Sequence, residues 1–239
     1  MPYLQDCCDD KSLVYQSHLM RIAAKLSIAI HLKISSHIVM LDHQEEIIRL
    51  NTFAANCHRA IEDNSLNKSI NAVKHFLYFN ATADTSYLRE GIINNFKTFF
   101  SNLLKLASKK KDFTVALPFI EWLYEFIIDC FEIGACYQRK ILGLYLYKTT
   151  MQFLSGDGIV SKEPIFKDAV KYGPALQLEM KNTGKWRFTD RESIVLLLKL
   201  ILDPASDVKE ISTNIIIEFF DANVVSDLEK NVSFVSFIY

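Results

Sequence analysis

Apolar side chains recur with the period of an α-helix from Tyr87 to Leu106, and this pattern most constrains the fold. The large apolar residues there are Leu88, Ile92, Phe96, Phe99, Phe100, Leu103 and Leu104. A helix with this spacing has one apolar stripe that must be buried against other elements. The chain also has only 7 Gly and 5 Pro in 239 residues, too few for a barrel or sandwich of many short strands. The sequence therefore predicts an all-α fold.

Helical periodicity extends over most of the chain. The predicted helices are 12–33, 44–62, 66–79, 87–106, 118–133, 136–153, 190–202 and 206–220. Gly134 is expected to end the helix that begins near Pro118, as a C-terminal cap. Prolines and glycines are frequent between 156 and 188, which predicts an irregular insertion with one short helix near 164–171.

A cation recurs at the sixth position of four predicted helix starts. These cations are Arg49, Arg89, Arg139 and Lys209, which are 40, 50 and 70 residues apart. The first spacing fits helical-pair repeats of ~40–47 residues. The clearest unit, Asp203–Lys209, resembles the second-helix start of a HEAT repeat, where the acid caps the turn and the cation can pair with acids of a neighbouring repeat. We expect a right-handed α-solenoid of HEAT/armadillo-like helical pairs, one segment over residues 1–239.

The sequence lacks the motifs of catalysis. It has no Gly-x-Gly-x-x-Gly turn, Walker loop or Gly-x-Ser-x-Gly elbow, which argues against an enzyme and against a bound cofactor. His31, His37 and His43 are spaced by six, hence ~120° apart on a helix, so they do not predict a metal site. With no apolar leader and no apolar run long enough to span a bilayer, we expect a soluble, cytoplasmic protein.

An acidic stripe runs along the helix predicted after Pro118. Its members, at helical spacing, are Glu121, Glu125, Asp129 and Glu132. Carboxylates in this pattern could serve acid–base chemistry or bind a metal. Because no histidine or calcium-loop motif joins them, a solvated helix face is the favoured interpretation.

A cluster of lysines is the best local cationic patch. Its members are Lys105, Lys109, Lys110 and Lys111. The net charge of -1 gives no global attraction to nucleic acid, so any such contact needs a patch of this kind. One interpretation is a solubilising helix end. The other is contact with RNA phosphates, which Lys140 could join if the intervening helical hairpin brings both ends to one edge.

The segment from Phe119 to Lys140 resembles the THADA (thyroid adenoma-associated protein) family. In that family a Phe-Leu-Glu-Trp-Leu helix precedes Gly-Ala-Ser-Tyr-Gln-Arg-Arg and an apolar helix. The matching positions here are Glu121, Trp122, Leu123, Gly134, Ala135, Tyr137, Gln138 and Arg139. Cys136 and Lys140 stand where the family usually has Ser and Arg. The likeness is specific over about 85–220 and vague before that.

Two departures from the family pattern bear on the extent of the chain. Family members are much longer solenoids, and their downstream Arg-Arg-Ser-Ala-Gly segment does not occur before Tyr239. We therefore expect the chain to be a fragment or a short form.

The resemblance implies a non-catalytic role in tRNA modification. Members of the family act as regulatory partners of an FtsJ-like methyltransferase that methylates a ribose 2′-hydroxyl in the tRNA anticodon loop. The solenoid would hold the tRNA, and S-adenosylmethionine would bind the enzyme. The alternative is a HEAT-type scaffold with a different partner, which could be membrane-bound, and without RNA contact. The near-zero net charge and the acidic stripe favour this alternative mildly.

Overall fold

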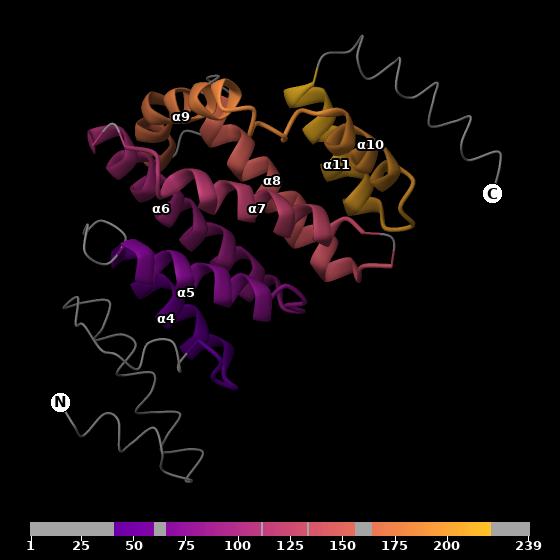
Figure 1. Cartoon of the computed structure of the whole chain (residues 1–239). Coiled ribbons are helices and arrows are strands. Elements are labelled where there is room, and N and C mark those ends of the chain that lie inside the picture. The colour runs from indigo at the N-terminus through magenta and orange to yellow at the C-terminus, as the bar shows by residue number, and fades with distance from the viewer. Residues whose placement is uncertain (1–40, 60–65, 111, 133, 156–163, 221–239) are drawn as a thin grey trace, which may run out of the picture. The chain divides into compact units, whose positions relative to one another are not determined.

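A computed structural model of the protein describes residues 41–59, 66–110, 112–132, 134–155 and 164–220. Within these ranges the chain forms eight α-helices and no strand (Figure 1). The predicted all-α class is therefore confirmed. None of the helices in these ranges combines the length and the apolar character needed to cross a bilayer.

The described residues fall into two compact units, divided between Lys110 and Lys111. The first unit holds α4 (Glu46–Arg59), α5 (Leu66–Phe79) and α6 (Ser86–Lys110). The second unit holds α7 (Ala116–Cys130), α8 (Tyr137–Ser155), α9 (Pro164–Asn182), α10 (Arg191–Ile201) and α11 (Ser206–Phe219). The helix predicted at 12–33 lies outside the described residues. A single solenoid segment over 1–239 stays a prediction.

In the first unit, α4 packs against both α5 and α6. The rings of Phe53 and Phe76 stack at 4.2 Å with their planes 5° apart, joining α4 to α5. From α6 come Phe96, Phe99 and Phe100, all with no exposed surface. These three are among the residues whose spacing predicted the helix, so the period identified the buried face as well as the element.

In the second unit, α8 is the central helix. It packs against α7, α9 and α11, and α10 packs against α11. Around its circumference Leu142, Leu144, Leu146, Tyr147 and Phe153 have no exposed surface. A helix that is apolar on almost all sides must be covered on several sides, and its three neighbours do this.

Arg49 and Arg89 hold the starts of their own helices in the same way. Arg49 Nη1 donates to the backbone carbonyls five and six residues earlier, at 2.9 and 2.7 Å. Arg89 Nη1 makes the same two contacts at 2.8 and 3.0 Å. At these two positions the recurring cation therefore has the same role: it binds the helix to the loop before it.

The described part of the predicted irregular insertion, residues 164–188, is largely helical. The sequence predicts a short helix near 164–171, but α9 continues through Gly173 and Pro174 to Asn182, so this prediction is wrong. Gly173 lies against α8 so closely that a Cβ on it would be 1.7 Å from the carbonyl oxygen of Phe153. The glycine therefore serves a close helix contact, and packing on α8 outweighs the roughly 3 kcal/mol by which a proline disfavours a helix interior.

We expect Gly173→Ala to destabilise the second unit by about 3 kcal/mol or more, because the backbone oxygen of Phe153 cannot rotate away from the added methyl group. This loss outweighs the gain of up to about 1 kcal/mol from the better helix propensity of alanine. Urea unfolding followed by circular dichroism measures the change in the free energy of unfolding.

Gly134→Ala is the matched control. It has φ +96° and nothing within 4 Å of an added Cβ, so only its backbone strain of about 1–2 kcal/mol applies. Equal losses in the two variants would contradict the close contact of α9 with α8.

Candidate functional site

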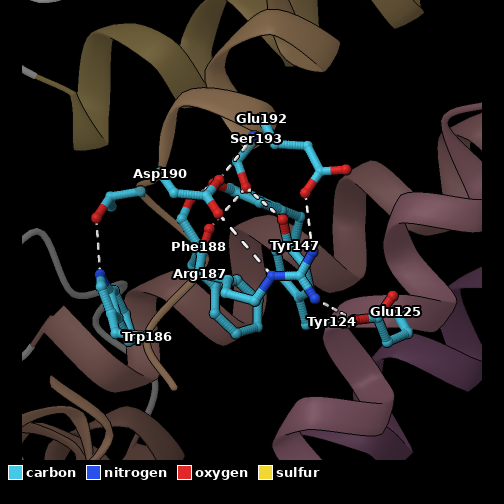
Figure 2. Close-up of polar contacts among 10 residues, drawn as sticks. Tyr124, Glu125, Tyr147, Trp186, Arg187, Phe188, Asp190, Glu192 and Ser193 are labelled. Atoms are coloured by element: carbon cyan, nitrogen blue, oxygen red, sulfur yellow. Dashed lines mark hydrogen bonds and ion pairs between the residues drawn. The ribbon is translucent and has the colours of Figure 1, made fainter. Parts of the chain in front are cut away.

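Arg187 stands at the centre of a polar and aromatic cluster in the second unit (Figure 2). Its guanidinium carbon lies 4.5 Å from the centre of the Tyr124 ring, within the range of a cation–π contact. Its Nη1 donates to Glu125, its Nη2 donates to Glu192 at 2.8 Å, and its Nε is 3.9 Å from Asp190. One side chain thus connects α7 to the start of α10.

Two helix-end signals shape the loop that carries Arg187. Gly184 has φ +68°. Its N–H donates to the Lys181 carbonyl at 3.2 Å, and the Lys185 N–H donates to the Met180 carbonyl at 2.8 Å. This pair of bonds is a Schellman motif, which ends α9. At the other end Asp190 caps α10 by accepting the Ser193 N–H at 2.9 Å. Both signals are readable in the sequence, so the loop is defined locally.

Phe188 fills the space between two buried tyrosines. Its ring centre is 5.2 Å from that of Tyr124 and 5.7 Å from that of Tyr147, whose hydroxyl donates to the Phe188 carbonyl. Ser193 Oγ donates to the Arg187 carbonyl at 2.8 Å, so the Tyr124 hydroxyl is the donor in its own 3.0 Å bond to Ser193. Burial raises the pKa of Tyr124 to about 12 and the pKa of Tyr147 well above its usual value. Both phenols stay protonated at neutral pH and fix the loop as donors.

A pocket of about 280 Å³ opens beside this cluster. Its lining residues are Glu121, Tyr124, Glu125, Gly184, Lys185 and Arg187. Glu121 Oε1 is 2.6 Å from Lys185 Nζ, so each of the two carboxylates in the lining has a cationic partner. The volume is slightly below the roughly 300 Å³ at which small-molecule sites begin. The arrangement is suited to holding the loop between α9 and α10 against α7, since its charges are already balanced.

The predicted acidic stripe divides into two parts. Glu121 and Glu125 pair with the loop, whereas Asp129 and Glu132 are exposed, as expected for a solvated face. Lys185 and Arg187 were not identified from the sequence. The signal that could have found them is the alternation of cations and aromatic residues between Gly184 and Asp190.

In the part of the chain that the structure describes, no group of three or more His, Cys, Asp or Glu side chains is placed to hold a metal ion. Of the three histidines singled out in the sequence, His43 lies in this part, and His31 and His37 lie outside it.

Several residues that carry the THADA-like resemblance form the junction between α7 and α8, and Glu121, Trp122 and Leu123 lie within α7. The helix α7 ends at Cys130, and the Phe131 N–H donates to the Ile128 carbonyl at 2.9 Å. Gly134 follows with φ +96°. The prediction that Gly134 caps the helix is therefore wrong: it has the left-handed backbone of a cap, but it lies in the turn between the helices.

Side chains of this motif hold α8 to its neighbours. The Tyr137 hydroxyl donates to Asp207 in α11. Arg139 hydrogen-bonds to Cys130 of α7, and this bond raises the pKa of the guanidinium. Trp122 lies beside two aromatic rings of its own helix, with ring centres 5.4 and 6.0 Å away. Two other residues of the motif are half-buried: Ala135 in the turn before α8 and Gln138 in the first turn of α8.

The candidate RNA-contacting lysines belong to both units. In the first unit Lys105 is half-buried and Lys109 is exposed, near the end of α6, whose last residue is Lys110. Lys111 lies outside the described residues. Lys140 belongs to the second unit, where its Nζ is 2.7 Å from Asp203 and its side chain is 17% exposed. A phosphate would have to compete with Asp203 for Lys140, whereas Lys105, Lys109 and Lys110 share one helix end.

Asp203 links the starts of α8 and α11. It accepts the ammonium of Lys140 and, through Oδ1, the Ala205 N–H at 3.0 Å. Burial alone would raise the pKa of Asp203, but these hydrogen bonds and the charges of Lys140 and Lys209 outweigh it and hold the pKa below its usual value. Asp203 thus caps its turn as expected, but the cation that pairs with it does not stand at a predicted position. The cation is Lys140, one position after the predicted Arg139.

No family model matches the chain, and neither a curated protein nor a solved structure matches it.

We expect Asp203→Asn to lower the free energy of unfolding at pH 7 by about 1–3 kcal/mol, since it removes a charged partner of a half-buried lysine. The folded-state pKa of Asp203 lies below the unfolded value of about 3.9, so its contribution is present above that pH and is lost as the pH falls through the folded-state pKa. Urea titrations from pH 7 into acid should show the difference from wild type shrinking.

Asp129→Asn serves as the control for this titration, because Asp129 is exposed on α7, and it should change stability little. A deficit of Asp203→Asn that stays constant into acid would contradict the assigned ion pair.

Tyr147→Phe is expected to cost about 1–3 kcal/mol of stability, because it leaves the buried Phe188 carbonyl without its donor. Thermal or urea unfolding measures the loss. Tyr145→Phe is the control on the same helix, because that side chain is 41% exposed and should tolerate the change. A Tyr147→Phe variant as stable as Tyr145→Phe would mean that this hydroxyl does not hold the loop.

Proposed function

We propose that this chain is a non-catalytic scaffold, or regulatory subunit, for 2′-O-ribose methylation in the tRNA anticodon loop, partnering an FtsJ-like methyltransferase. The observation that carries the proposal is the α7–α8 junction. Gly134, Tyr137 and Arg139 match the THADA-like pattern there, as Trp122 does within α7, and the contacts of Tyr137 and Arg139 join α8 to α11 and α7. Such residues specify how helices pack against one another. This suits a family whose members act as scaffolds and do not catalyse a reaction.

The arrangement of helices supports a solenoid as the architecture of this scaffold. Helices adjacent in sequence pack together in the pairs α4–α5, α7–α8, α8–α9 and α10–α11. Contacts between neighbours in sequence are the basis of helical-repeat folds. In the proposal such pairs continue as a right-handed stack of HEAT/armadillo-like units in a cytoplasmic protein.

The distribution of charge supports RNA contact through the first unit. Its described residues include nine Lys and Arg against five Asp and Glu. Those of the second unit include eleven Lys and Arg against thirteen Asp and Glu. A local cationic excess attracts the phosphate backbone even where the net charge of the chain is near zero. Of the lysine cluster, Lys105, Lys109 and Lys110 belong to this unit.

The mechanism would be positioning. Phosphate contacts fix the register and orientation of a nucleic acid without reading its sequence. A scaffold that holds the anticodon arm beside the methyltransferase raises the effective concentration of the target 2′-hydroxyl at the enzyme. The enzyme itself would supply the methyl donor and the chemistry, so this chain would need neither.

A protein-binding scaffold without RNA contact is the second candidate. Exposed apolar side chains of α11 and of the turn before it favour it: Ile217 is 75% exposed and Leu202 is 70% exposed. A protein partner would cover such residues, whereas an RNA backbone would not. Recovery of another stable partner without a methyltransferase in a pull-down would support this alternative.

Mapping of ribose methylation in cells that lack the gene tests the main proposal. We expect methylation of the anticodon loop to fall, because the enzyme would lose the partner that presents its substrate. Restoring the wild-type gene should restore the modification. Unchanged methylation in the deletion strain would rule out the proposed role.

A charge-reversal variant tests the lysine cluster in the same strain. Lys109→Glu, Lys110→Glu and Lys111→Glu together should restore methylation poorly and weaken tRNA binding. The slope of binding against salt should fall by roughly one for each phosphate that the variant no longer binds. Lys199→Glu, an exposed site on α10 in the second unit, is the control. Full rescue by the triple variant would show that the cluster only solubilises the helix end.

A further inference from the structure

Two aromatic side chains at the end of α5 are exposed, unlike Phe53, Phe76 and Phe96 in the core of the same unit. Tyr78 is 67% exposed and Phe79 is 61% exposed. Their ring centres lie 5.5 Å apart with planes at 77°. Grouped exposed rings of this kind mark a contact surface, whereas single scattered apolar side chains do not.

The backbone that follows these rings is held in place. Asn80 donates to the Phe76 carbonyl at 2.9 Å and accepts from Arg49 Nε at 3.0 Å. Arg89 binds the carbonyls of residues 83 and 84 at the other end of the loop. Because the loop is fixed at both ends, the two rings project from a preorganised backbone. Binding of a ligand to the rings therefore costs little conformational entropy of the protein.

The same side of α5 carries cations. We call it the α5 face, and its residues are Lys68, Lys74, His75, Tyr78 and Phe79. At about 100° per residue, Lys68, His75 and Phe79 fall within about 40° of one another, whereas Tyr78 lies about 60° and Lys74 about 100° from His75 around the helix. The helix contains no Asp or Glu.

Within the described residues, Asp42 is an acidic group that contacts the α5 face. Its two carboxylate oxygens lie 2.8 and 2.9 Å from His75 Nε2. The Asp42 carboxylate is therefore bound to the His75 ring. Lys68 is exposed, and its ammonium group can attract an anion. Exposed rings interleaved with cations match the chemistry of a single-stranded nucleic acid, which presents bases for stacking and phosphates for charge pairing.

We propose that the α5 face binds single-stranded RNA, with bases stacked on Tyr78 and Phe79 and phosphates contacted by Lys68 and Lys74. RNA loops offer unpaired bases that duplexes do not, and stacking on aromatic rings tolerates any sequence. The inference rests on the proposed function for the choice of RNA as the ligand. The start of α6 follows Tyr78 and Phe79 after a short loop. Because α6 rises 1.5 Å per residue, this start and Lys109 are about 35 Å apart, so the rings and the lysine cluster can be tested separately.

The test is fluorescence anisotropy of the full chain with a short labelled oligouridylate, which has no secondary structure of its own. We expect Tyr78→Ala with Phe79→Ala to weaken binding about fivefold or more. Tyr78→Phe keeps a stackable ring and should bind within twofold of wild type. Lys68→Gln should lower the salt slope of binding by about one, since it removes one phosphate contact. Circular dichroism of each variant shows that the exposed substitutions leave the fold intact.

Tyr145→Ala is the matched control, because Tyr145 is an exposed aromatic residue of the second unit and should leave the affinity unchanged. Absence of oligouridylate binding by wild type, or binding by the double alanine variant within twofold of wild type, would overturn the proposal. So would loss of a bound protein partner by that variant with RNA affinity intact, which would make the α5 face a protein interface. The assay contains no methyltransferase, so its outcome is independent of the methylation map that tests the proposed function.

Discussion

Burial of α8 is the constraint on which the second unit depends. Leu142, Leu144, Leu146 and Tyr147 are successive or alternate positions, so no single neighbouring helix could cover them all. Contacts with α7, α9 and α11 supply the cover. Two glycines allow the closest approaches: a Cβ on Gly143 would lie 2.6 Å from the Cβ of Cys130, and one on Gly173 would meet the α8 backbone.

The polar groups of the second unit are placed at the edges of this apolar centre. At the start of α8, Tyr137 and Lys140 bind the carboxylates of Asp207 and Asp203. Farther along the helix, Lys148 Nζ lies 3.1 Å from Glu218. These contacts fix the register of α11 on α8, because polar partners, unlike dispersion contacts, must meet at specific positions. The THADA-like motif coincides with the first of these contacts, so its residues contribute to helix register.

The two units differ in the groups to which their cations are bound. This difference is the reason for assigning the proposed RNA contacts to the first unit. In the second unit Arg187 and Lys185 are neutralised by carboxylates of α7 and α10, which leaves a small, balanced pocket. In the first unit two arginines bind backbone carbonyls, and Lys68 on α5 and Lys109 near the end of α6 are exposed. A scaffold for RNA would therefore make its phosphate contacts through the first unit and leave other surfaces for a protein partner.

The sequence by itself determined the all-helical class, the buried stripe of α6 and the recurring cation at helix starts. These features depend on residues close in sequence: periodic apolar side chains, and arginines that bind carbonyls five and six positions earlier. Only the tertiary structure decided the length of α9, the pairing of Lys140 with Asp203 and the cluster around Arg187. Gly173 and Pro174 suggest a break when considered alone, and their cost is offset only by contact with α8. The Arg187 cluster joins residues more than 60 positions apart, so its geometry depends on how the helices pack and not on local propensity.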